Sequence, residues 1–156
     1  SFYPSFFQIL HDQHEVLILH EKDDKWHAKY GIHYATSEDG IDWKCKPGLI
    51  IPIKDKYEHS FGRPSVVYWD NFYHMWFAHR GTKNYTTYRI GYANSEDGIN
   101  WVRNDKKSGI NISDSGWDSE SICYPYLFEH KGKKFMLYCG NNYGETGFGY
   151  AVGKND

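Results

Sequence analysis

The sequence contains no run of apolar residues near the roughly 20 that a membrane-spanning helix needs, so it gives no sign of a membrane segment. It has no excess of positive charge either, because 18 Lys and Arg stand against 20 Asp and Glu, for a formal net charge of −2. Proteins that bind nucleic acid or anionic membranes usually present a basic patch. We therefore expect neither kind of partner.

Cysteine is scarce, and its pattern excludes common metal motifs. Cys45, Cys123 and Cys139 are an odd number and lie at no metal-ligand spacing. We interpret them as reduced thiols. Reduced thiols are typical of a cytoplasmic protein, which we therefore expect. The chain also opens without a signal-peptide pattern.

Helical periodicity and several functional motifs are missing as well. The segment 99–112 is too rich in Asn, Gly and Asp for a helix. No phosphate-binding loop or nucleophile elbow is present. The histidines in HDQHE (His11–Glu15) fall in an expected hairpin turn, whereas zinc-binding HExxH needs a helix. We therefore expect no metal and no cofactor.

Aromatic residues are abundant, with 14 Tyr, 9 Phe and 6 Trp, and they occur in a repeated pattern. The segment YGIHYATSEDGIDW (Tyr30–Trp43) returns 58 residues later as YRIGYANSEDGINW (Tyr88–Trp101), with ten of 14 positions identical. A third copy, TGFGYAVG, begins at Thr146 but is not followed by a third SEDG. Self-similarity at a fixed period of this length indicates a repeat architecture.

Each repeat contains strands. SVVYW and FYHMWFAH are β-branched and aromatic and flank the turn residues Asp70 and Asn71. In the SEDG turn that follows the next strand, we expect the Asp97 carboxylate to cap the turn and Gly98 to adopt a positive φ. We expect Trp101 to begin a fourth strand.

Four antiparallel strands in each 60-residue unit predict an all-β fold, a partial β-propeller. The predicted single domain, 1–156, has blades at about 4–53, 64–112 and 122–152, the third without its outer strand. Because blades pack face to face, both faces of each sheet are covered, which suits wide aromatic side chains. Trp43 and Trp101 are expected at equivalent positions between blades, as packing residues.

The SEDGIxW motif after an IxYA strand resembles the five-bladed propellers of the arabinanase, xylosidase, invertase and levansucrase superfamily. The ordered series from Phe61 to Asn141, with YGETGFGYAV (Tyr143–Val152), is most similar to bacterial glycosyl-hydrolase-like proteins of polysaccharide loci, in their C-terminal half. The resemblance implies five blades, or roughly 290 residues at this period. It also implies that the blades giving the two catalytic Asp residues are absent here.

An open stack of blades would expose broad apolar faces at its two ends. The chain can be a fragment of a longer protein, a naturally shortened form with repacked ends, or one half of a self-association. We favour a homo-oligomer, a dimer, formed through the open faces.

In a propeller, the innermost strands line a central funnel, and the residues just before them face a ligand. Two such segments are DKYEHSFGRP and SGWDSESICYP, whereas the corresponding first segment, SFYP, has no carboxylate. The candidate residues in these segments are Glu58, His59, Arg63, Trp117, Asp118, Glu120 and Tyr124. Arg80 and Asn141, at matching ends of the second strands, form a further set.

Glycosidases use paired carboxyl groups, so Glu120 is the candidate acid and Glu58 the candidate base or stabiliser. Trp117 or Tyr124 can offer a platform to a sugar ring, and Arg63 can hold a carboxylate or phosphate. Alternatively, Glu58 and Arg63 form an ion pair, and Glu120 accepts backbone hydrogen bonds from a neighbouring blade. Arg80 and Asn141 then merely sit in rim turns.

Two functions remain open. The first is a carbohydrate-related propeller that cleaves or transfers a glycosyl unit. The second is a non-catalytic module that binds sugars or assembles through its open faces. The first predicts loss of turnover on Glu120→Gln, and the second predicts binding or oligomerisation without turnover.

Overall fold

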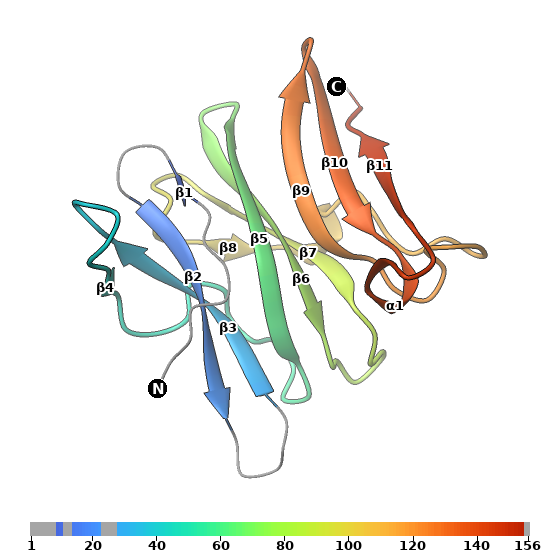
Figure 1. Cartoon of the computed structure of the whole chain (residues 1–156), viewed down its shortest axis with the longest axis horizontal. Helices are drawn as coiled ribbons and strands as arrows, with labels where there is room; N and C mark the ends of the chain where they lie inside the picture. The colour runs from blue at the N-terminus through green and yellow to red at the C-terminus, as the bar shows by residue number, and fades with distance from the viewer. Residues whose placement is uncertain (1–8, 11–13, 23–27, 155–156) are drawn as a thin grey trace.

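The computed structural model describes residues 9–10, 14–22 and 28–154, which form three antiparallel sheets (Figure 1). The strands of the first sheet, in order, are β1 (Ile9–Leu10), β2 (His14–Lys22), β3 (Ala28–Thr36) and β4 (Lys44–Cys45). Those of the second are β5 (His59–Trp69), β6 (Phe72–Arg80), β7 (Arg89–Ser95) and β8 (Val102–Arg103). Those of the third are β9 (Cys123–His130), β10 (Lys133–Cys139) and β11 (Phe148–Val152).

Each sheet follows chain order, every strand pairing with the one before it, and the second sheet lies between the other two (Figure 1). A 3-10 turn, η1 (Asp105–Lys107), and a single helical turn, α1 (Asn141–Gly144), are the helical elements of the described chain. The predicted all-β, partial-propeller fold is confirmed. The third sheet has three strands, as the shortened third repeat indicated. The expected start of the first blade, at residue 4, lies outside the described residues.

The SEDG turns have the predicted geometry. Ser95 Oγ accepts a hydrogen bond from the Gly98 N–H (2.9 Å), and Asp97 Oδ1 accepts from the N–H groups of Ile99 (2.9 Å) and Asn100 (2.7 Å). Gly98 has a φ of +73°. The first copy makes the same bonds at Ser37, Asp39, Gly40, Ile41 and Asp42. Each turn therefore closes through contacts within a few residues.

The second sheet buries both faces, because successive strand residues point to opposite sides. One core lies between the first and second sheets and contains Ile32, Ile51, Phe61, Val66, Met75, Phe77, Ala93 and Trp101. The other lies between the second and third sheets and contains Ile90, Ile122, Leu127, Met136 and Tyr138. Trp101 is buried and donates its indole N–H to the Gly98 carbonyl (3.0 Å), as expected of a packing residue. Trp43, at the matching place, is half-buried.

Candidate functional site

The first strands of the second and third sheets are distorted at equivalent places. Arg63 in β5 has a φ of +49° and Tyr124 in β9 has a φ of +57°, and each directly precedes a proline. The pairing of β5 shifts register around Gly62. Positive φ in a residue other than glycine costs free energy and is concentrated at functional sites. This repeated strain marks the start of the innermost strands as a constrained region.

Side chains from both sheets meet beside these two positions. The Arg63 guanidinium lies 5.2 Å from the centre of the Tyr124 ring. Arg80, at the end of β6, lies 5.0 Å from the centre of the Tyr88 ring and donates to the Tyr143 hydroxyl (2.9 Å). The three tyrosine rings have centres 5.6–6.3 Å apart. We call Arg63, Arg80, Tyr88, Tyr124 and Tyr143 the Tyr–Arg cluster.

Sequence reasoning had selected three members of this cluster, Arg63, Arg80 and Tyr124, but not Tyr88 or Tyr143. The available signals were the position of Tyr88 at the start of the repeated strand and that of Tyr143 at the end of the rim turn. Burial raises the pKa of Tyr88 and, with nearby Cys123 and tyrosines, raises that of Tyr124 to about 12. The hydroxyls of Tyr88 and Tyr124 therefore stay protonated at neutral pH.

Glu120 is exposed, but its backbone is fixed beside the cluster. Its N–H donates to the Asn141 side-chain oxygen (2.8 Å). Its carbonyl accepts from the Thr87 hydroxyl (2.8 Å) and from Arg89 Nη1 (2.9 Å). It is thus the main chain of Glu120, rather than its carboxylate, that makes the contacts with the neighbouring sheet. Asn141 is buried and braces this segment, since it also accepts from the Ser121 N–H (3.0 Å).

Glu58 lies in a buried ion-pair network, not at an open surface. Its side chain is 1% exposed and receives two hydrogen bonds from Arg103, at 2.6 and 2.8 Å. His79 Nδ1 lies 2.9 Å from Glu58 Oε1, and the Lys54 N–H donates to Oε2 (3.0 Å). The suggested Glu58–Arg63 pair was therefore wrong in its partner. Arg103, 45 residues from Glu58 in sequence, takes that place.

The network keeps Glu58 ionised. Burial alone would raise the pKa of this carboxyl, but hydrogen bonds from Arg103, His79 and the Lys54 backbone hold it well below its usual range. Arg103 is held as firmly, because its guanidinium lies against the rings of Phe61 (5.1 Å) and Phe77 (5.3 Å). The arrangement ties the loop before β5 to the end of β8.

The remaining predicted residues are engaged in packing or local contacts. Trp117 stacks on Tyr138, with ring centres 5.2 Å apart. Asp118 is buried and accepts from the Tyr138 hydroxyl (2.9 Å). His59 is half-buried, with Nδ1 2.7 Å from the Ser60 hydroxyl. Their roles toward a sugar stay predictions.

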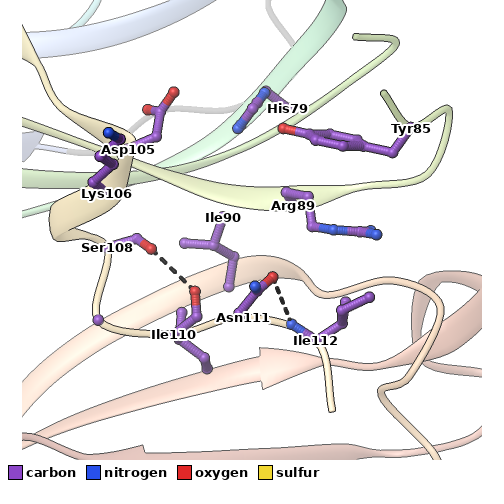
Figure 2. Close-up of a pocket in the computed structure, with 11 residues that line it drawn as sticks. His79, Tyr85, Arg89, Ile90, Asp105, Lys106, Ser108, Ile110, Asn111 and Ile112 are labelled. Atoms are coloured by element: carbon purple, nitrogen blue, oxygen red, sulfur yellow. Dashed lines mark hydrogen bonds between the residues drawn. The ribbon is translucent and has the colours of Figure 1, made fainter. Parts of the chain in front are cut away.

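A cavity of about 640 Å³ lies beside the start of β7 (Figure 2). Its polar lining includes His79, Tyr85, Arg89, Asp105, Lys106 and Asn111. Ile90, Ile110 and Ile112 supply the apolar part. β8 pairs with β7 at Ala93 and Asn94, and the Asn104 N–H donates to the Tyr92 carbonyl (2.8 Å), so the cavity lies against the earlier residues Arg89 and Ile90.

Within the part of the chain that the structure describes, no three His, Cys, Asp or Glu residues are grouped as a metal site. The described helical elements are also far too short to cross a bilayer. Part of the His11–Glu15 segment lies outside the described residues.

We compared the chain with known proteins by sequence and by fold. No protein-family model matches the sequence. Two proteins of Mycobacterium tuberculosis, the uncharacterised proteins MT1551 (strain CDC 1551 / Oshkosh) and Rv1502 (strain H37Rv), are each 44% identical over 124 residues. The match covers 80% of this chain but 40% of each relative, so this chain spans less than half the length of those proteins.

Solved structures share the fold at low sequence identity. The family 117 glycoside hydrolase Zg3597 of Zobellia galactanivorans has a TM-score of 0.71 at 22% identity, covering 97% of this chain and 52% of that one. The Bombyx mori GH32 β-fructofuranosidase BmSUC1 has a TM-score of 0.65 at 21% identity, covering 95% and 33%. The chain is thus a partial β-propeller with the fold of the propeller glycoside hydrolases.

Proposed function

We propose that this chain is the carbohydrate-binding part of a glycoside-hydrolase-like propeller, and that the Tyr–Arg cluster binds a negatively charged saccharide. The observation that carries the proposal is the cluster itself. Arg63 lies against the Tyr124 ring and Arg80 against the Tyr88 ring, and Arg80 also donates to the Tyr143 hydroxyl.

The chemistry of the cluster suits a charged sugar. Aromatic rings pack against the apolar face of a pyranose, and their hydroxyls remain available for hydrogen bonds. Guanidinium groups bind carboxylate, phosphate or sulfate in a planar, two-point geometry. Arg63 and Tyr143 are exposed, so a ligand can reach both from solvent.

Glycan binding tests the proposal. We expect acidic oligosaccharides to bind in preference to neutral ones of equal length on a glycan panel. Tyr143→Ala and Arg63→Ala should each weaken binding by about tenfold, as expected when a stacking or charged contact is lost. Tyr68→Ala is the matched control, because Tyr68 is a similarly exposed tyrosine in β5 outside the cluster. Absence of binding across the panel, or equal loss in the control, would refute the proposal.

Glycosidic bond cleavage is the second candidate function, favoured by the exposed Glu120 carboxyl on a fixed backbone beside the cluster. Glu58 fits the role of second carboxylate less well, since Arg103 and His79 occupy its oxygens. Hydrolysis of an aryl-glycoside panel that is abolished by Glu120→Gln, with unchanged folding, would support cleavage. Turnover that survives this substitution would remove Glu120 as the acid.

A further inference from the structure

The cavity beside β7 is separate from the Tyr–Arg cluster. His79 and Arg89 are directly paired across β6 and β7, and both line the cavity. Their chain neighbours Arg80 and Tyr88 belong to the cluster. None of the five cluster residues lines the cavity, so a ligand there meets a different set of side chains.

His79 offers the cavity a hydrogen-bonding ring nitrogen. Its side chain is 2% exposed, and Nδ1 faces the Glu58 carboxylate at 2.9 Å. Nδ1 is thus turned to Glu58, and Nε2 is the ring nitrogen left for a ligand hydroxyl, which can both donate and accept a hydrogen bond. The buried Glu58–Arg103 pair fixes this orientation in advance of binding.

Arg89 offers the cavity a positive charge. Nη1 is occupied, because it donates to the Thr87 hydroxyl and to the carbonyls of Tyr88 and Glu120, all within 2.9 Å. The guanidinium is held 4.7 Å from the centre of the Tyr85 ring. Its other N–H groups make no hydrogen bond to any residue that the structure describes. They are therefore available to a carboxylate.

The remaining walls suit a small molecule with an apolar side. Figure 2 shows His79 and Tyr85 on one side of the cavity and Ile110, Asn111 and Ile112 on the other. Ile90 adds a third apolar surface. The volume lies within the usual range of small-ligand pockets.

We propose that this cavity is a second ligand site, which takes a small polyhydroxylated carboxylate such as a sugar acid. The carboxylate binds Arg89, a hydroxyl forms a hydrogen bond with His79 Nε2, and the apolar ring face lies on the three isoleucines. The proposal stands independently of ligand binding at the Tyr–Arg cluster.

Methyl NMR of isoleucine-labelled protein tests the site, with D-glucuronate as the probe and D-glucose as its uncharged match. We expect saturable shifts at Ile90, Ile110 and Ile112 with D-glucuronate, and about tenfold weaker binding of D-glucose. The methyl signals of Ile32 and Ile51, in the other core, should not shift, which reports an intact fold.

Arg89→Leu and His79→Phe should each weaken D-glucuronate binding by about tenfold. Asn111→Trp is an independent test, because Asn111 is exposed and a large ring there blocks the cavity without touching the buried network. Lys107→Met is the control, since Lys107 is exposed in η1 but does not line this cavity.

Three outcomes would overturn the proposal: no shift at the three isoleucines, equal affinity for the two sugars, or unchanged binding in a folded Asn111→Trp variant. D-glucuronate binding that is lost in Tyr143→Ala but unchanged in Asn111→Trp would likewise refute this cavity while supporting the Tyr–Arg cluster.

Discussion

At the residue scale, the Glu58–Arg103 pair decides whether Glu58 is structural or catalytic. Both side chains are 1% exposed, and His79 Nδ1 also lies 2.9 Å from the Glu58 carboxylate. Removing one partner of a buried pair leaves the other charge without compensation, at a cost of about 3 kcal/mol or more. We therefore predict that Glu58→Gln lowers the free energy of unfolding by about 3 kcal/mol, measured by denaturant titration.

Glu120→Gln is the matched control for this prediction. Because Glu120 is exposed, its substitution should change the free energy of unfolding by less than about 0.5 kcal/mol. A Glu58→Gln protein as stable as the wild type would contradict the structural role. Loss of turnover in such a protein would return Glu58 to the catalytic pair.

The Glu58 carboxylate also predicts that the free energy of unfolding depends on pH. Its pKa is lowered in the folded protein relative to its ordinary value of 4.5. The unfolded chain therefore takes up this proton first as the pH falls, and the stability present above pH 4.5 is lost progressively toward the folded pKa. Unfolding free energy measured from neutral pH to about pH 3 should fall more steeply in the wild type than in Glu58→Gln. Parallel curves for the two proteins would show that Glu58 does not contribute.

At the scale of elements, the two SEDG turns depend on glycine at one position. Gly40 and Gly98 both have a φ of +73°, and a Cβ on either would meet nothing closer than ordinary contact. Only the backbone conformation is then penalised. We predict that Gly40→Ala and Gly98→Ala each cost about 1 kcal/mol of unfolding free energy. Thermal or denaturant unfolding will measure this, with exposed Glu96→Ala as control, and a negligible cost at both glycines would be inconsistent with the turn geometry.

The turn carboxylates support the same geometry. Hydrogen bonds from the N–H groups of Asp42 and Ile41, and then from the Ser37 hydroxyl, lower the pKa of Asp39 to about 2. Asp97 is lowered in the same way by Asn100 and Ile99. Both turns are thus closed by ionised aspartates across the neutral pH range.

At the scale of the whole molecule, the third sheet leaves apolar side chains exposed. Phe148 is 78% exposed, Tyr150 66% and Tyr126 59%, on the strands β9 to β11. A face of this kind is typical of an interaction surface. We predict that the chain on its own self-associates through it, so that light scattering after size exclusion gives a mass above 18.4 kDa.

Substitution of the face checks that prediction. Phe148→Glu combined with Tyr150→Glu should return the mass to 18.4 kDa, because two charges cannot be buried in an apolar contact without a large cost. Tyr68→Glu, an exposed tyrosine in β5, should leave the mass unchanged. A wild-type monomer at tens of micromolar would contradict the prediction.

The sequence by itself determined the repeat, the strands and the turns. The SEDG bonds close within three residues, as at Ser95, Asp97 and Gly98, so the local order of residues is enough to specify them. Aromatic and β-branched residues likewise specify the strands, as in β5 and β6. From these local rules the stacked-sheet architecture follows, with three members of the Tyr–Arg cluster.

Only the tertiary structure decided which distant side chains meet. Arg103 reaches Glu58 across 45 residues, and Arg80 reaches Tyr143 across 63. The cavity forms between the start of β7 and the loop that follows η1, and no local pattern marks this meeting. Such contacts depend on how the sheets stack, because the stacking sets the distance and direction between side chains that the chain order keeps far apart.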